Sequence, residues 1–356
     1  MKTLMVMAGG TGGHIFPGIA VAECLRERGW RIVWMGNPAG MEARIVPARG
    51  YEMAWMKFSA LRGKGIVRLA LLPFTLLGGF WQALGALRRV RPDVVLGMGG
   101  YVTFPGGMMA ALTGRALVLH EQNAIAGLAN RVLAHVADRV LAGFPDVLKG
   151  ADWVGNPVRS EISAVAPPEE RFSGRNGPLR LLVVGGSLGA AALNQIVPQA
   201  LARIDPAQRP IVTHQAGEKQ IDALRAAYRE AGVDGELLPF IEDMARRYAD
   251  ADLVICRSGA LTVAELAAVG AASLLVPFPH AVDDHQSSNA RFLSDHDAAF
   301  VLPQTELDPM RLAGILAGLD RRRLQTMAMR ARALARPRAA ESVADACEQL
   351  AQEVSR

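Results

Sequence analysis

The sequence has few cysteines, and none of them is spaced for a disulfide scaffold or a clustered metal site. Only Cys24, Cys256 and Cys347 occur among 356 residues, and no two form a C-x-x-C motif. An odd number of scattered thiols is typical of a reducing compartment rather than of a secreted domain. With 51% hydrophobic and 21% charged residues, the chain is predicted to be globular and to form two domains.

A secretory leader pattern is also missing from the start of the chain. The apolar run that follows Lys2 stops at Gly9 and Gly10. A signal peptide needs a longer apolar segment and a small-residue cleavage site. We therefore interpret this run as the first β-strand of the fold.

Acidic residues are absent between Met53 and Pro92, although seven basic residues lie there. Residues 1–158 contain 17 basic and 9 acidic side chains, whereas residues 159–356 contain 22 and 25. The first part of the chain is therefore basic and the second mildly acidic, so an anionic partner is expected near the first part.

Charge is missing altogether from residues 69–87, a stretch long enough to cross a membrane. Pro73, Gly78, Gly79 and Gly85 disfavour a true span. The favoured interpretation is a peripheral patch on an anionic membrane surface, and the alternative is a buried core helix with a basic collar. Nucleic acid is a poorer partner, because the stretch is too apolar for a phosphate-binding groove. The patch residues are Leu72, Phe74, Leu77, Phe80 and Trp81, ringed by Arg68, Arg88 and Arg89.

Apolar runs alternate with helical patterns along the whole chain, which predicts α/β architecture with mainly parallel sheets. We expect two doubly wound, Rossmann-like domains facing across a cleft, residues 1–158 and 159–337, with a boundary near Gly155-Asn156-Pro157. Pro337 interrupts a helical pattern, so the final helix, residues 338–356, is expected to return to the first domain. The predicted strands are 3–8, 31–35, 93–97, 116–120, 139–142, 180–184, 211–215, 236–240, 252–256 and 272–276.

Two of these strands run into glycine-rich turns that precede helices. The turns are Gly9-Gly10-Thr11-Gly12-Gly13 and Gly185-Gly186-Ser187-Leu188-Gly189. Such turns bring backbone N–H groups and a helix N-terminus towards a phosphate, although they also serve as plain connections. Because the pattern occurs twice, it predicts one anion-binding turn in each domain.

Neither turn contains the G-x-G-x-x-G motif of dinucleotide-binding proteins. The acidic residue that would hold a ribose is also missing, since the next strands end in Met35-Gly36-Asn37 and His214-Gln215-Ala216. These absences disfavour a nicotinamide-dependent oxidoreductase.

A better nucleotide site follows the strand that ends at Cys256. Backbone N–H groups from Gly259 to Thr262 are placed to bind a diphosphate, and Glu265 lies one turn further, within reach of a ribose. The alternative is that Thr262-x-x-Glu265 forms a capping box. The loop after the next strand carries Gln286 to the same sheet edge, which favours a ligand site.

Together these segments resemble the UDP-N-acetylglucosamine transferases of glycosyltransferase family 28 that convert lipid I to lipid II in bacterial peptidoglycan synthesis. The resemblance covers essentially the whole chain, and Leu188 departs from the glutamine usual in the family. It implies a GT-B fold and an enzyme of cell wall biogenesis, cell shape and cell division that is peripheral to the cytoplasmic face of the inner membrane. The matching segments are residues 9–18, 99–102, 120–123, 127–131, 155–159, 257–265, 276–278 and 286–290.

The resemblance also implies roles for individual residues. Donor-binding residues would be Thr11, Gly12, Gly13 and Asn123 in the first domain, with Arg159, Ser187, Ile241, Ala260, Leu261, Thr262, Val263, Ala264, Glu265 and Gln286. Acceptor-binding residues would be Tyr101, His120 and Asn130.

The implied reaction is inverting transfer from UDP-N-acetylglucosamine to the 4-hydroxyl of the muramyl sugar of undecaprenyl-linked lipid I. It needs a base, for which His14 is preferred, with Glu121 as the alternative; His14 could instead bind the turn or the leaving phosphate. No metal or other cofactor is expected, because Asp295-His296-Asp297 follows no apolar strand. A nucleotide-sugar epimerase, another lipid glycosyltransferase or a membrane-binding module remain as alternatives.

Overall fold

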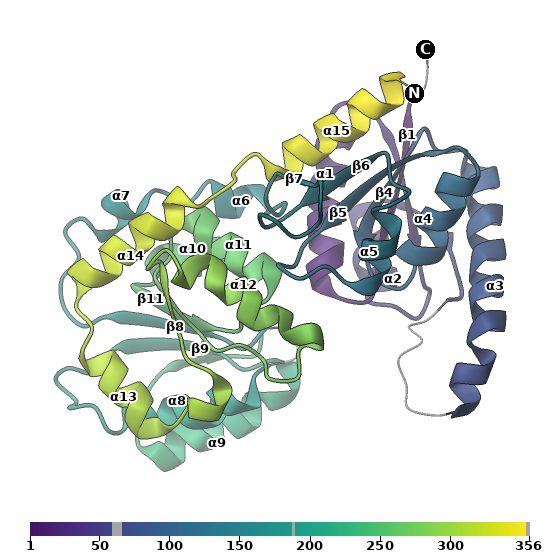
Figure 1. Ribbon diagram of the computed structural model, residues 1–356. Coiled ribbons are helices and arrows are strands. Elements are labelled where there is room, and N and C mark those ends of the chain that lie inside the picture. The colour runs from purple at the N-terminus through teal and green to yellow at the C-terminus, as the bar shows by residue number, and fades with distance from the viewer. Residues whose placement is uncertain (59–65, 187–188, 354–356) are drawn as a thin grey trace. The chain divides into compact units, whose positions relative to one another are not determined.

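The computed structural model describes residues 1–58, 66–186 and 189–353, and the chain divides into two compact units (Figure 1). Unit 1 comprises Met1–Arg159 and Arg336–Arg356, and unit 2 comprises Ser160–Ala335. Ser187 and Leu188 lie outside the described residues, as do the side chains of residues 66–72 and of Val282. Each unit is an α/β domain built on a parallel sheet.

Unit 1 contains a seven-stranded parallel sheet in the order β3-β2-β1-β4-β5-β6-β7. This order is doubly wound, as the predicted fold class requires, with the chain running outwards from β1 in both directions. The strands are β1 (Thr3–Ala8), β2 (Arg31–Gly36), β3 (Glu52–Trp55), β4 (Val94–Gly99), β5 (Ala116–Glu121), β6 (Arg139–Ala142) and β7 (Asp152–Trp153). The helices are α1 (Gly12–Glu27), α2 (Glu42–Ile45), α3 (Ile66–Val90), α4 (Thr103–Leu112), α5 (Leu128–Leu133) and α15 (Ala339–Glu353).

Helices cover both faces of this sheet, and β1 is therefore buried on both sides. Leu4 and Val6 point into one hydrophobic cluster with α1 and α15, whereas Met5 and Met7 point into another with α3 and α4. Successive side chains of a strand face opposite sides, so a strand with helices on both faces is apolar throughout. This explains why the first strand could be read from an uninterrupted apolar run.

Unit 2 repeats the plan with six parallel strands in the order β10-β9-β8-β11-β12-β13. Its main core lies between the sheet and helices α8, α9, α13 and α14. The strands are β8 (Arg180–Val184), β9 (Ile211–Gln215), β10 (Glu236–Leu238), β11 (Leu253–Cys256), β12 (Ser273–Leu275) and β13 (Ala299–Val301). The helices are α6 (Ser160–Ser163), α7 (Pro168–Phe172), α8 (Ala191–Leu201), α9 (Ile221–Ala231), α10 (Met244–Asp250), α11 (Ala260–Val269), α12 (His285–Ser294), α13 (Pro309–Ala317) and α14 (Arg321–Ala333).

Three strands, β3, β7 and β13, were not predicted. All three are edge strands of two to four residues with partly exposed side chains. β3 and β7 carry charged residues, and β13 is apolar but only three residues long, so none of them shows the longer apolar run of a central strand. Every predicted strand is present.

The chain returns to unit 1 after α14. Pro337 follows the end of α14 and precedes α15, which packs against α1. Close to this point the Arg336 guanidinium lies 3.8 Å from the ring centroid of Trp153. A Cβ at Gly155, whose φ is +87°, would lie 2.4 Å from the Arg336 Cβ, so only glycine fits here.

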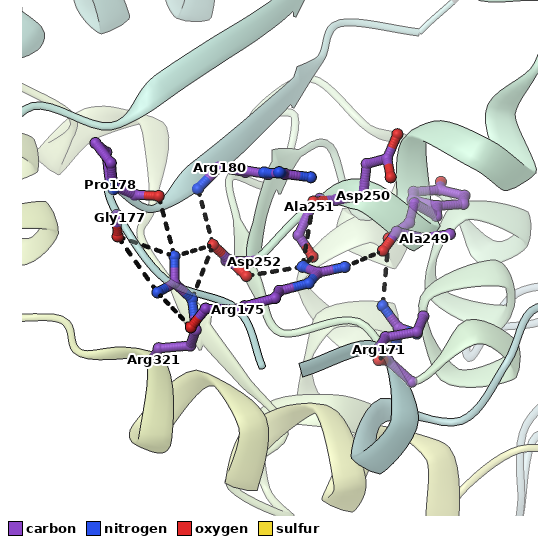
Figure 2. Close-up of polar contacts among 12 residues, drawn as sticks. Arg171, Arg175, Gly177, Pro178, Arg180, Ala249, Asp250, Ala251, Asp252 and Arg321 are labelled. Carbon is purple, nitrogen blue, oxygen red and sulfur yellow. Dashed lines mark hydrogen bonds and ion pairs between the residues drawn. The ribbon is translucent and has the colours of Figure 1, made fainter. Parts of the chain in front are cut away.

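A buried carboxylate, Asp252, joins three segments at the amino end of β11 (Figure 2). It accepts bonds from the guanidinium groups of Arg175 and Arg321 at 2.8 and 3.0 Å, and from the backbone N–H of Arg180 at 2.9 Å. Burial alone would raise the pKa of Asp252, but its bonds to Arg321 and Arg175 lower it. The cluster fixes the start of unit 2 against its sheet.

Candidate functional site

In unit 1, the candidate residues gather at the carboxyl ends of three adjacent strands, β1, β4 and β5. His14 lies in the first turn of α1 after β1, Tyr101 follows β4, and Gln122 follows β5. His14 Nδ1 lies 2.9 Å from Gln122 Oε1. His14 and Gln122, which are 108 positions apart in the sequence, therefore meet at the carboxyl edge of the sheet, where parallel sheets of this kind bind ligands.

His120 lies beneath this edge rather than on it. The ring is fully buried, with Nε2 2.9 Å from the Gly155 carbonyl oxygen and Nδ1 3.0 Å from Gln122 Nε2. Burial lowers the pKa of His120 to about 4, while its bond to Gly155 acts in the opposite direction. Both ring nitrogens already have partners in the protein, so the side chain supports its neighbours instead of presenting a group to the acceptor.

In the first glycine turn, one backbone N–H group is bonded to a buried side chain of unit 1. The Gly10 N–H donates to Glu42 Oε2 at 3.1 Å, and Glu42 Oε1 accepts from the Asn37 N–H and the Tyr101 hydroxyl. The Glu42 side chain has no exposed surface. A Cβ at Gly9 would lie 2.7 Å from its Oε1, so this glycine makes room for an internal carboxylate rather than for a phosphate.

Glu121 holds the loop that follows β5. Its Oε1 accepts from the Asn123 N–H at 2.8 Å, and its Oε2 accepts from the Gly127 N–H at 3.2 Å and from Asn130 Nδ2 at 2.8 Å. Glu121 and Asn130 are both buried. With both carboxylate oxygens occupied by N–H donors, this geometry favours a loop anchor over a base, and it places the Asn130 amide inside the loop.

In unit 2, a neutral amide closes the second glycine turn. Gln215 Oε1 accepts from the Gly186 N–H at 3.1 Å, and Gln215 Nε2 donates to the carbonyl oxygens of Gly186 and Pro239. Gln215 thus links the ends of β8 and β9 to the loop after β10. That loop leads to Ile241, which is buried. The predicted contact at Ser187 lies outside the described residues.

The α11 helix begins at the carboxyl end of β11 without a side-chain cap. Gly259 is its N-cap, in an extended conformation, so Ala260, Leu261 and Thr262 form the first turn. The capping-box alternative is therefore wrong: Thr262 is inside the helix and cannot cap it. Glu265 is buried and accepts a 3.2 Å bond from the Tyr248 hydroxyl. The first-turn N–H groups of α11 have no intrahelical acceptor, which suits an anion.

The loops after β11 and β12 meet next to this helix. The Ser258 hydroxyl donates to the Gln286 carbonyl oxygen at 2.8 Å, and Asn289 Nδ2 donates to the Ser258 carbonyl oxygen at 3.1 Å. Gln286 Oε1 in turn accepts from the Phe278 N–H. The sequence predicted that both loops reach one sheet edge, and these bonds join them there.

The predicted membrane patch lies on α3, one face of which packs on the sheet of unit 1. Phe74, Leu77 and Trp81, spaced three and four residues apart, are 72%, 55% and 70% exposed. Because these three side chains are exposed, α3 is not the fully buried core helix of the alternative interpretation. Phe80, by contrast, packs against Phe104 of α4. Arg88 and Arg89 are exposed in the last turn, while the side chains of Arg68 and Leu72 lie outside the described residues.

Within the described parts of the chain, none of the helices combines the length and hydropathy required to cross a membrane. The same residues contain no group of three or more histidine, cysteine, aspartate or glutamate side chains arranged to hold a metal ion. Asp295 and Asp297 are exposed at the carboxyl end of α12, and Asp297 pairs with Arg330 at 3.0 Å.

Three residues that sequence reasoning left without a role are central to these arrangements: Glu42, Gln122 and Gln215. Gln122 follows the end of a predicted strand and Gln215 is the last residue of another, so the position of both at a strand end was a usable signal. Glu42 carried none, because its partners Gly10 and Tyr101 are 32 and 59 positions away.

Comparison with known proteins relates both units to one family. Residues 4–142 match the glycosyltransferase family 28 N-terminal domain, and residues 180–350 match the family 28 C-terminal domain. The N-terminal match lies within unit 1, and the C-terminal match covers most of unit 2 and continues into α15, which belongs to unit 1.

Relatives match along almost the entire chain. A protein of Aromatoleum aromaticum is 77% identical over 351 residues, covering 99% of this chain and 98% of that protein. One of Azoarcus sp. strain BH72 is 75% identical over 352 residues, 99% of each. Both are named UDP-N-acetylglucosamine–N-acetylmuramyl-(pentapeptide) pyrophosphoryl-undecaprenol N-acetylglucosamine transferase. The crystal structure of Acinetobacter baumannii MurG is similar with a TM-score of 0.86 at 38% identity, covering 98% of this chain and all of that one.

Proposed function

Because the chain belongs to glycosyltransferase family 28 and has its GT-B fold, we propose that it transfers N-acetylglucosamine from UDP-N-acetylglucosamine to undecaprenyl-linked lipid I. The nucleophile is the 4-hydroxyl of the muramyl sugar, and the product is lipid II. The observation that carries this proposal is the 77% identity, over nearly the whole chain, to a transferase named for these substrates. The chain would thus serve peptidoglycan synthesis, and with it cell wall biogenesis, cell shape and cell division.

The donor is assigned to unit 2, at the carboxyl edge of β8, β11 and β12. The first turn of α11 supplies N–H groups for the diphosphate, Glu265 lies one turn further for the ribose, and Gln286 is held by the adjoining loops for the sugar. The backbone of Ile241, in the segment after β10, is assigned to the uracil. Helix-terminal N–H groups stabilise the charge that develops on departing UDP, so no metal or other cofactor is proposed and activity should persist in EDTA.

The acceptor is assigned to unit 1, with His14 as the base. The His14 ring lies at the open end of β1, and its Nδ1 is held by Gln122. The hydroxyl proton passes to His14 as the oxygen attacks the anomeric carbon, and the carbon–oxygen bond to UDP breaks on the opposite face with inversion. Tyr101, His120, Glu121 and Asn130 are assigned to positioning, because each is bonded within unit 1.

The patch on α3 is proposed to bind an anionic bilayer, which would place the enzyme at the cytoplasmic face of the inner membrane. Exposed Phe74, Leu77 and Trp81 supply apolar area, and Arg88 and Arg89 supply attraction to anionic headgroups. Trp81→Ser should weaken sedimentation with phosphatidylglycerol vesicles, whereas Met310→Ser should not. Met310 is the matched control, since it is 74% exposed but lies on α13 of unit 2.

The deciding experiment measures UDP release from UDP-N-acetylglucosamine with and without a short-chain lipid I analogue. Release that requires the acceptor supports the transferase, and His14→Ala should then lower kcat by about 10²- to 10⁴-fold with donor binding unchanged. Conversion of the donor alone would indicate an epimerase. Absence of release under both conditions would refute the assignment, and unchanged kcat in His14→Ala would remove only the base.

A further inference from the structure

Four hydrogen bonds join His14, Gln122 and His120 to one another and to two backbone carbonyl oxygens. His14 Nδ1 lies 2.9 Å from Gln122 Oε1. Gln122 Nε2 lies 3.0 Å from His120 Nδ1 and 2.9 Å from the His120 carbonyl oxygen. His120 Nε2 lies 2.9 Å from the Gly155 carbonyl oxygen. In these three side chains, every ring nitrogen and side-chain amide atom is hydrogen-bonded except His14 Nε2, which has no hydrogen-bond partner among the described residues.

Two carbonyl oxygens determine the direction of every bond, because a carbonyl oxygen can only accept. The Gly155 carbonyl oxygen requires a proton on His120 Nε2, so His120 Nδ1 of the neutral ring is an acceptor. The His120 carbonyl oxygen requires that the Gln122 atom facing it be the NH₂ group, whose two hydrogens serve that oxygen and His120 Nδ1. The amide oxygen of Gln122 therefore faces His14, and it can only accept.

From this geometry we infer that Gln122 is a positioning residue that keeps the proton of neutral His14 on Nδ1 and leaves Nε2 as the basic nitrogen. The inference rests on the proposed transferase function and extends it. During transfer, the acceptor hydroxyl gives its proton to His14 Nε2 and its oxygen forms the bond to the anomeric carbon. The bond to the UDP oxygen breaks, and its electron pair leaves with UDP. The Nδ1–H bond to Gln122 is kept throughout.

The surroundings hold this arrangement in place. Asn156 Nδ2 donates to the Gln122 carbonyl oxygen at 2.9 Å, which fixes the backbone of the positioning residue. A Cβ at Gly99 would lie 2.8 Å from His14 Cε1 and Nδ1, so a glycine allows the ring to lie against β4. Burial keeps His120 neutral near pH 7, because its pKa is lowered to about 4. A protonated His120 could not accept the bond from Gln122.

The direct test reads the tautomer of His14 by long-range ¹H–¹⁵N NMR of the full chain with ¹⁵N-labelled histidine and no substrate. His14→Gln identifies the signal. The wild type should show protonated Nδ1 and unprotonated Nε2. In Gln122→Met, which retains side-chain length but lacks the amide, this preference should be lost. Protonated Nε2 in the wild type, or an unchanged tautomer in Gln122→Met, would overturn the inference.

A double-mutant cycle provides the kinetic test. Gln122→Met should lower kcat by about tenfold to a hundredfold while the donor KM stays the same, because a general base contributes roughly 10²- to 10⁴-fold and ordering it is part of that effect. In the His14→Ala background the same change should have little further effect, since the base is already gone. An equal fall in both backgrounds would show that Gln122 acts only on structure and would overturn the inference.

Control measurements separate this inference from the proposed function. Gln195→Met makes the same replacement at an exposed position of α8 in unit 2 and should leave kcat and the His14 tautomer unchanged. If no acceptor supports UDP release but the Nδ1–H tautomer depends on Gln122, the transferase proposal fails and the structural part of the inference stands. If transfer to the acceptor occurs but His14 carries its proton on Nε2, the transferase proposal stands and the inference about Gln122 fails.

Discussion

The two glycine turns occupy equivalent places in the two sheets, yet they are closed by different chemical groups. In unit 1 the Gly10 N–H donates to the buried carboxylate of Glu42, whereas in unit 2 the Gly186 N–H donates to the neutral amide of Gln215. A phosphate approaching the first turn would meet a negative charge, and one approaching the second would not. The repeated motif therefore does not imply a repeated function, and the difference favours unit 2 as the site of the diphosphate.

Buried carboxylates show a related contrast between the units. Glu42 is held by two backbone N–H groups and a tyrosine hydroxyl at the carboxyl ends of the strands. Asp252 is held by Arg175 and Arg321 at the amino end of β11. Buried charges require paired or hydrogen-bonded partners. Of these two carboxylates, only Asp252 forms ion pairs with cationic side chains among the described residues, so we assign it to the structural scaffold of unit 2.

The largest expected effect comes from removing the charge of this scaffold. Asp252→Asn leaves Arg175 and Arg321 without their carboxylate, so the free energy of unfolding of unit 2 should fall by about 3 kcal/mol. Urea unfolding measures it. The control is Asp222→Asn, whose carboxylate is 92% exposed in its pair with Arg225 and should contribute at most about 0.5 kcal/mol. Equal effects would contradict the scaffold role.

Each unit buries a histidine in a strand of its sheet, His120 in β5 and His214 in β9, which predicts a loss of stability in acid. Burial lowers the pKa of His120 to about 4 and that of His214 to about 3. Below the unfolded value of about 6.5, the unfolded chain binds protons that the folded chain does not. The contribution is complete above pH 6.5 and falls by about 2 kcal/mol for each histidine between pH 6.5 and 5.

Urea unfolding at a series of pH values tests this slope. His214→Gln should flatten it for unit 2, whereas His296→Gln, at an exposed histidine after α12, should not. An unchanged slope in His214→Gln would show that His214 titrates normally in the folded chain.

The difference between the two glycine turns is tested most directly by placing a negative charge at the turn of unit 2. Gln215→Glu brings a carboxylate to the turn after β8, so UDP affinity measured by calorimetry should fall about tenfold through repulsion of the diphosphate. Gln215→Met is the matched control, because it removes the same bonds to Gly186 and Pro239 without adding charge. Equal losses in the two variants would mean that charge at this turn is irrelevant.

The smallest effect is expected from neutralising the first turn. Glu42→Gln replaces one acceptor oxygen by an NH₂ group that faces a donor, so the free energy of unfolding should fall by about 1 kcal/mol. UDP affinity should stay unchanged, because the donor is assigned to unit 2. A clear change in UDP affinity would contradict that assignment.

Local sequence patterns predicted most of the fold for identifiable reasons. Strands buried on both faces, such as β1 and β8, are uninterrupted apolar runs, and Pro337 marks the break between α14 and α15. Local reasoning was wrong about the Thr262–Glu265 capping box. The helix begins at Ala260, and its N-cap is Gly259 in an extended conformation, with no capping side chain.

The sequence by itself determined two α/β units, all of their strands except the short edge strands β3, β7 and β13, the glycine turns and the family, because these depend on neighbouring residues and on motifs within short segments. Only the tertiary structure decided what each turn holds and how His14 is oriented. Glu42 reaches Gly10 across 32 positions, and Gln122 reaches His14 across 108. Such contacts form where strands distant in sequence end at one sheet edge, and no local pattern encodes which of their side chains meet there.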